Sequence, residues 1–253
     1  MKLEEMTWPE ALRVDRDRSV VLLPIAACEQ HSHHLPTFTD TILCGNIASR
    51  VEANLSDQVL LLPTLWFGAS EHHLPFGATV TVKTMTHVQL LAELLTPFLD
   101  DGFRRVMILN GHGGNIDTLR LALRTLQPNY QDRFLTGASY WELAADELAS
   151  LATDKRKNMG HACEFETSMV MHLRPDLVRK DKIQNDGREY PHLKGLFVAA
   201  DMSQRTERGC VGYPESATPE LGEKFFEAAV AKVTEAVQAV LAHEIVATRT
   251  ASL

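Results

Sequence analysis

The 253-residue sequence lacks several features that would assign it to a specialised class of protein. Its four cysteines, Cys28, Cys44, Cys163 and Cys210, stand far apart and form no CxxC pair, so we expect neither a disulfide framework nor a thiolate metal site. No stretch approaches the ~20 apolar residues that span a bilayer. The start, MKLEEMTWPEAL, lacks the basic and apolar segments of a signal peptide. We therefore expect a cytoplasmic protein.

Positive charge is also scarce. Lys and Arg number 25 against 33 Asp and Glu, and the resulting net charge of −8 argues against nucleic acid or an anionic membrane as the main partner. The phosphate-binding patterns GxGxxG and GxxxxGK[ST] are absent, as is the GxSxG elbow of serine hydrolases. These absences argue against both kinds of phosphate-binding loop and against a serine hydrolase.

Four short apolar runs rich in Val, Ile and Leu lack strict alternation, as strands buried on both faces of a sheet do. Helix-like segments separate them, and Gly102 and Pro128 close two of these segments. This alternation predicts an α/β fold, with one domain over residues 1–253 and a mainly parallel sheet in a three-layer α/β/α arrangement. The predicted strands are 20–27, 58–67, 104–110 and 133–141, and the predicted helices are 40–55, 86–102 and 115–127.

Two C-terminal segments have different character. Residues 218–246 open with Thr-Pro-Glu and keep a helical apolar period, which predicts a long helix packed on the outside. Residues 180–216 are polar and weakly periodic, which is typical of a loop that borders a site. No internal repeat or linker divides the chain.

The stretch CEQHSHHLPTFTD, Cys28 to Asp40, concentrates acidic and histidine side chains directly after the first predicted strand. Glu29 and His31 would leave the same face if the strand continued through them. Ligand sites of open α/β sheets lie at the carboxyl ends of strands. Asp40 precedes a predicted helix, where it is either an N-cap or a carboxylate that caps or bridges a metal site. The neighbouring Glu29 and His31 favour the metal role.

The motif NGHGGN, residues 110–115, follows the third predicted strand and precedes a helix. Its paired glycines permit a tight turn and close approach of the backbone to a ligand, and His112 is its one strong metal ligand. The alternative is a structural glycine-rich turn with an incidental histidine.

The segment GHACEFETSMVMHLRP, residues 160–175, has helical periodicity. Glu166 lies in the middle of its apolar face, whereas Glu164 points away. A carboxylate on a buried face must be paired, hydrogen-bonded or bound to a metal, so Glu166 is the candidate ligand. His161 lies at the helix start, where a capping or surface role is the alternative to a role in the site.

Histidine and carboxylate ligands together suit Zn, Mn or Fe. The three clusters offer more ligands than one tetrahedral site uses, and two ions that share a carboxylate would explain the surplus.

These motifs resemble those of the creatininase, or creatinine amidohydrolase, family. The family pattern GxxEQHGPHLPxxTD stands here as AACEQHSHHLPTFTD, with Ser32 and His33 in place of Gly and Pro, and NGHGGN is unchanged. HAGxxETS stands as HACEFETS, with Cys163 in place of Gly, and GxSxxHxxFPGT is similar to GASEHHLPFGAT at residues 68–79. The resemblance covers about residues 20–176, in the family's order.

The resemblance implies a creatininase-like fold and a binuclear metal-dependent amidohydrolase that cleaves a C–N bond of a small cyclic amide, formamide or related substrate. It implies a homo-oligomer, commonly a hexamer built from dimers. It places the metal ligands on Glu29, His31, Asp40, His112 and Glu166, with Asp40 bridging two divalent ions, and a catalytic histidine on His161. We expect Ser70, His72 and Gly113, which lie in these motifs, to contact the substrate.

Creatininases that act on creatinine carry a Tyr-Glu pair after the motif histidine, with the Glu binding metal, where this chain has Gly113 and Gly114. This departure counts against creatinine as the substrate and leaves a ligand position for which Glu166 is the candidate. The alternative function is a non-catalytic metal or small-molecule binding protein on the same scaffold. A mononuclear iron oxygenase that uses His31 and His112 is disfavoured by the surplus of carboxylates.

Overall fold

The computed structural model describes residues 1–188 and 196–245. Within them, four parallel strands form one sheet in the order β2-β1-β3-β4. Because neighbouring strands run parallel, their carboxyl ends meet at one edge, which is where ligand sites form in open sheets. The strands are β1 (Val20–Ile25), β2 (Val59–Leu61), β3 (Arg105–Asn110) and β4 (Phe134–Ser139).

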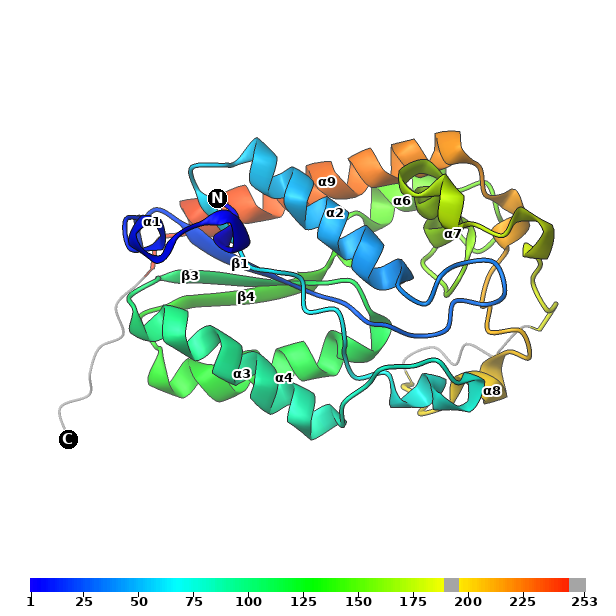
Figure 1. The fold of residues 1–253 in the computed structure, drawn as a ribbon, viewed down its shortest axis with the longest axis horizontal. Helices are drawn as coiled ribbons and strands as arrows, with labels where there is room; N and C mark the ends of the chain where they lie inside the picture. Colours follow the sequence, from blue (N-terminus) through cyan, green and yellow to red (C-terminus); the bar gives the residue numbers. More distant parts are fainter. Residues whose placement is uncertain (189–195, 246–253) are drawn as a thin grey trace.

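Helices cover both faces of this sheet, as Figure 1 shows. Val20 and Leu22 of β1 pack into one apolar cluster and Val21 and Leu23 into another, since alternate residues of a strand face opposite sides. The predicted three-layer α/β/α arrangement is therefore confirmed. The first cluster includes α2 (Thr39–Asn54), α5 (Tyr140–Leu143), α6 (Ala145–Leu151), α7 (Glu164–Leu173) and α9 (Pro219–Ala242), and the second includes α3 (Thr84–Asp100) and α4 (Ile116–Leu126).

The helix predicted at 218–246 is α9. Thr218 is its N-cap, and its hydroxyl accepts a hydrogen bond from the Leu221 N–H at 3.1 Å. The helix packs along α7 and α2 with one face buried (Figure 1). None of the described helices is long and apolar enough to cross a lipid bilayer.

Short helices occupy the connections. Two of them, η2 and α8, pack against each other beside the carboxyl edge of the sheet, and this contact positions the site. The short elements are α1 (Trp8–Ala11), α8 (Met202–Arg205), η1 (Leu3–Glu5), η2 (Glu71–Phe76), η3 (Gly113–Asn115), η4 (Gln127–Asn129), η5 (Pro175–Leu177), η6 (Lys180–Lys182) and η7 (Pro214–Ser216).

The predicted strands are shorter in the structure, and residues 140–141 of the predicted strand 133–141 begin helix α5. β2 ends at Leu61, and the prediction of a continuous strand over 58–67 is wrong, because Pro63 has no N–H and interrupts the ladder, which resumes only as an isolated bridge between Ile25 and Leu65. β1 ends at Ile25, so the strand does not continue through the first motif. Of the predicted loop 180–216, residues 189–195 lie outside the described residues, as does residue 246 of the predicted C-terminal helix.

Candidate metal centre

The five side chains predicted as metal ligands lie together beyond the carboxyl ends of β1 and β3. The loop after β1 carries two of them, the first turn of α2 carries the third, and the loop after β3 and helix α7 carry the others. All five are at most 6% exposed, which is unusual for charged side chains without a ligand. The five residues are Glu29, His31, Asp40, His112 and Glu166.

Asp40 lies between two histidines. Its Oδ1 is 3.0 Å from Nε2 of His31, and its Oδ2 is 3.0 Å from Nδ1 of His112. Phe38, not Asp40, is the N-cap of α2, so the helix-capping alternative is wrong. The carboxylate instead faces the cluster with both oxygens.

Glu29 and Glu166 lie on opposite sides of this arrangement. Glu29 Oε1 is 3.2 Å from Nδ1 of His112, whereas Glu166 Oε1 is 3.8 Å from Nε2 of His31. Each end of the cluster therefore holds one carboxylate and one imidazole, with Asp40 shared between them.

The cluster satisfies the requirements for holding divalent metal ions. Three overlapping sets have ligand atoms within 4.8 Å of one another: Glu29 with His31 and His161, Glu29 with His72 and His112, and His31 with Asp40 and Glu166. Four buried side-chain atoms of the cluster make no hydrogen bond to any described residue, although the imidazole and carboxylate groups of the cluster lie at ion-pair distance from one another. A buried polar atom without a hydrogen-bond partner is costly, so four such atoms in one cluster fit a bound cation. The four atoms are Glu29 Oε2, His31 Nε2, Asp40 Oδ2 and Glu166 Oε2.

The charges of the metal-free cluster depend on one another. Burial opposes charge on His112, but the carboxylates of Glu29 and Asp40 outweigh it and raise its pKa to about 10. Burial likewise opposes charge on His31, and Asp40 and Glu166 still raise its pKa. The same contacts lower the pKa of Asp40 against the effect of burial, whereas burial dominates for Glu29 and raises its pKa.

Neighbouring side chains fix which ring nitrogens face the cluster. Ser70 Oγ lies 3.2 Å from Nε2 of His112, and Nδ1 of that ring therefore points at the carboxylates. Ser70 is fully buried beneath the histidine, so the structure gives it an orienting contact in place of the predicted substrate contact. His31 Nδ1 lies 3.2 Å from the Glu29 carbonyl oxygen, which leaves Nε2 toward Asp40.

His161 lies next to the ligands, three residues before α7, in a backbone bridge with Val211. Its Nε2 is 2.8 Å from the carbonyl oxygen of Gln30, to which it can donate, and its Nδ1 is 3.8 Å from Glu29 Oε1. Burial and the proximity of His31 lower the pKa of His161 well below its usual value. Because Gln30 contacts Nε2, the other ring nitrogen, Nδ1, faces the cluster.

Helix α7 differs from the prediction in one respect. Glu164 does not face solvent: it is fully buried, and its carboxylate accepts hydrogen bonds from the Thr153 N–H at 3.0 Å, the Thr153 hydroxyl and the Asp154 N–H at 3.3 Å. Periodicity within one helix cannot reveal a contact with a distant segment. Glu166 faces the ligands as predicted.

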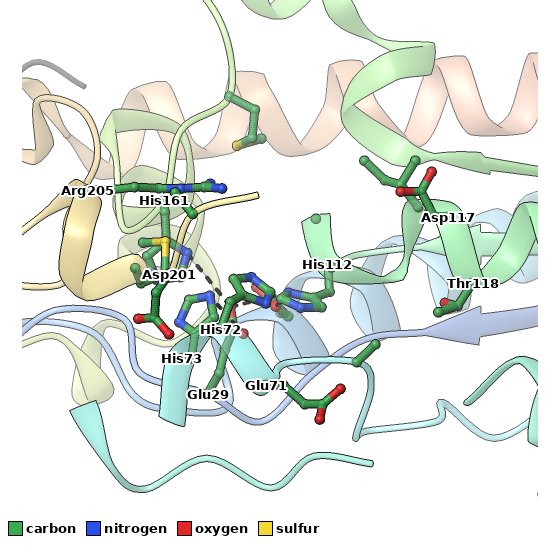
Figure 2. Close-up of a pocket in the computed structure, with 18 of the residues that line it drawn as sticks. Glu29, Glu71, His72, His73, His112, Asp117, Thr118, His161, Asp201 and Arg205 are labelled. Atoms are coloured by element: carbon green, nitrogen blue, oxygen red, sulfur yellow. Dashed lines mark ion pairs between the residues drawn. The ribbon is translucent and has the colours of Figure 1, made fainter. Parts of the chain in front are cut away.

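A pocket of about 730 Å³ opens beside the cluster (Figure 2). His72 and Gly113, both predicted to contact the substrate, line it, and a Cβ built at Gly113 would meet nothing within 4 Å. Segment 197–205 supplies part of the wall, which agrees with the prediction that residues 180–216 border a site. The wall residues from this segment are Phe197, Ala199, Ala200, Asp201, Met202 and Arg205.

Two residues of the centre were missed from the sequence. His73 is buried, with Nε2 3.1 Å from Glu29 Oε2 and Nδ1 3.1 Å from Nε2 of Gln30. A usable signal existed, because the histidine of the pattern GxSxxHxxFPGT falls on position 73. Gln30 holds His161 and His73 in place, a role that its motif position alone did not reveal.

The remaining motif histidines lie outside the ligand groups. His34 Nε2 is 2.9 Å from the Thr167 hydroxyl, and burial lowers the pKa of His34 to about 4. His33 is 3.5 Å from the Arg208 guanidinium at the surface. Ser32 adopts a left-handed backbone, with φ 58°, at the position where the family pattern has glycine.

Comparison with known proteins agrees with this geometry. The family model for creatininase, described as creatinine amidohydrolase, matches residues 4–237. The chain belongs to the creatininase family. It is 27% identical to the creatinine amidohydrolase of Pseudomonas putida over 260 residues, which cover 92% of this chain and 95% of the relative. It is 28% identical to the mycofactocin precursor peptide peptidase of Mycolicibacterium smegmatis over 212 residues, covering 82% and 79% of the two chains.

Solved creatininase structures share the fold. A manganese creatininase superposes with a TM-score of 0.81 at 26% identity, covering 96% of this chain and 99% of the other. A creatininase variant of Zn–Zn type superposes with a TM-score of 0.79 at 25% identity, covering 96% and 98%. The chain is therefore a creatininase-family amidohydrolase, a metal-dependent hydrolase of C–N bonds with histidine, glutamate and aspartate side chains positioned to hold the metal.

Proposed function

We propose that this protein is a binuclear hydrolase that cleaves an amide C–N bond in a small cyclic amide, formamide or related substrate. The position of Asp40, with one oxygen beside His31 and the other beside His112, carries the proposal. His31 and Glu166 would hold one ion, Glu29 and His112 would hold the other, and Asp40 would serve both. The Zn–Zn type of a creatininase neighbour supports two ions, and the ligand types suit Zn, with Mn or Fe as alternatives.

When bound, the ions supply Lewis acidity, which polarises a carbonyl and lowers the pKa of water from ~15.7 to ~7. The chain supplies the proton transfer. In the proposed reaction, Nδ1 of His161 accepts the proton of the attacking water and returns it to the leaving nitrogen. Gln30 holds Nε2 of the same ring, which keeps Nδ1 directed at the cluster.

The pocket supports a small polar substrate. Its volume, about 730 Å³, lies within the range of small-molecule sites, and its lining includes charged groups. The glycines at 113 and 114, where creatininases acting on creatinine carry Tyr-Glu, argue against creatinine. The charged lining residues include Glu71, Asp117, Asp201 and Arg205.

A panel of cyclic amides, formamides and short peptides, assayed with protein reloaded with Zn, Mn or Fe, tests the proposal. We expect turnover of at least one non-peptide amide by the wild type and its loss in the matched variant His161→Ala. Full metal content without turnover of any panel member would favour a non-catalytic binding protein and contradict the hydrolase proposal.

We also propose a homo-oligomer, a hexamer by the family resemblance. Light scattering that gives the 28.2 kDa monomer mass across a wide concentration range would contradict it.

A further inference from the structure

His72 lies on the pocket side of the proposed metal centre. It belongs to η2, which packs against α8, and its ring stacks on His112 with centroids 5.6 Å apart and an interplanar angle of 19°. One of its ring nitrogens lies within 4.8 Å of ligand atoms of both Glu29 and His112. Figure 2 shows the three side chains gathered together, with Asp201 and Arg205 of the pocket wall nearby.

The backbone at Gly114 makes room for this arrangement. A Cβ built there would lie 2.8 Å from Cε1 of His72, 2.5 Å from Nε2 of His112 and 2.2 Å from the Ala69 carbonyl oxygen. Real Cβ atoms essentially never approach so closely, so residue 114 must be glycine while both rings occupy these places. The chain thus reserves the space beside His112 for a second imidazole.

The two ends of the cluster are unequal without His72. His31, Asp40 and Glu166 form a complete group of three at one end. At the other end, Glu29 and His112 form a group of three with His72, whereas the nearby carboxylate of Asp40, 3.0 Å from His112, also serves the first end. We propose that His72 is a direct ligand of the ion held by Glu29 and His112, and is not only part of the pocket wall. This inference rests on the proposed binuclear function.

An imidazole ligand has a chemical consequence. Imidazole suits Zn and Fe, whereas carboxylate oxygen suits Mn, so His72 biases this end of the centre toward Zn or Fe. Replacing the imidazole by a carboxylate should shift the preference toward Mn. The choice of metal in this protein would then depend on a residue outside the five predicted ligands.

A spectroscopic experiment tests ligation directly. The variant His72→Cys, reloaded with Co²⁺, should show a near-ultraviolet thiolate-to-cobalt charge-transfer band that the wild type lacks. Glu71→Cys is the matched control, because Glu71 lines the same pocket on the same short helix but its carboxylate accepts from the Thr84 N–H at 3.2 Å, away from the ligands. A band in His72→Cys alone supports the proposal, and its absence from a cobalt-loaded variant overturns it.

Chelator competition provides the second readout. His72→Ala should bind one of its two ions at least about tenfold more weakly than the wild type, since loss of a supporting group at a metal site already costs 10–100-fold. His33→Ala, which removes a surface histidine, should match the wild type, and His72→Asp should gain affinity for Mn relative to Zn.

Two ions bound by His72→Ala with unchanged affinity would overturn the inference and leave the binuclear function intact. A wild type that binds one ion would overturn the binuclear function, and the cobalt band would still decide the role of His72.

Discussion

Asp40 and His112 lie 3.0 Å apart, from Oδ2 to Nδ1, while the other oxygen of the same carboxylate lies 3.0 Å from Nε2 of His31. One carboxylate thus separates two imidazoles that come from different loops. A simple ion pair joins one carboxylate to one cationic group, whereas each oxygen of this carboxylate faces a different imidazole. A ligand that bridges two metal ions needs this arrangement.

Removing the shared carboxylate should therefore affect both ends of the centre. Asp40→Ala should lose both ions, whereas Glu29→Ala should mainly weaken the one beside His112. Metal analysis after reloading with Zn, Mn or Fe and desalting measures the difference. A wild-type content well under one equivalent would contradict a metal centre, and an Asp40→Ala protein that keeps one tightly bound ion would contradict bridging.

The variant His161→Ala should keep its fold and metal but lose turnover by about 10²–10⁴-fold, which is typical of removing an acid–base group. The reason is that Nδ1 faces the cluster while Gln30 holds Nε2. Steady-state kinetics on whichever panel substrate is cleaved, with metal analysis of the same sample, checks this. If the variant sheds an ion in proportion to its lost activity, His161 is a ligand, as its grouping with Glu29 and His31 allows.

The metal-free protein should lose stability as the pH rises. The pKa of His112 is about 10 in the folded state against 6.5 as its ordinary value, and that of His31 is also raised. Their stabilising contribution is fully present below about pH 6.5 and is lost as the pH approaches 10. Thermal melts of chelator-treated protein should show a falling Tm across this window, and His112→Gln should flatten the fall. A metal-free wild type whose Tm stays level or rises would contradict the prediction.

Glu164 and Glu166 of α7 should respond differently to substitution by glutamine. Glu164→Gln should lower the free energy of unfolding by about 1–3 kcal/mol without changing metal content, because it places an amide against the buried donors of Thr153 and Asp154. Glu166→Gln should instead lose metal affinity. Denaturant unfolding and metal analysis of both variants separate the effects, and metal loss from Glu164→Gln would reverse the assignment.

The fold could be predicted well from local patterns, because the buried strands and amphipathic helices are long enough to show their period. The predicted helix 40–55 is observed as Thr39–Asn54, and the strand 104–110 as Arg105–Asn110. The prediction failed at an edge strand, where one proline interrupted the ladder. It also failed for Glu164, whose partners lie on a separate segment that helical periodicity does not describe.

The five candidate metal ligands could be predicted from the sequence, whereas the places of His72 and His73 beside them could not. Glu29, His31 and Asp40 lie close in sequence, the glycine-rich turn indicated His112, helical periodicity indicated Glu166, and the motif resemblance placed all five in one site. The family pattern marks position 73, but local sequence does not show how the rings of His72 and His73 are directed. A one-residue rotation along a short helix decides which ring stacks on His112 and which pairs with Glu29. Side-chain direction at a loop is set by packing, which local sequence does not specify.

The pocket wall formed by residues 197–205 belongs to a stretch of chain that contributes none of the five predicted ligands. Those ligands lie between residues 29 and 166, on the loops after β1 and β3 and on α2 and α7. Substitutions within 197–200, which precede α8, can therefore alter which molecules fit without changing any of the five ligand positions. Within one family, such a separation lets these five ligand positions be retained while the specificity of the enzyme diverges.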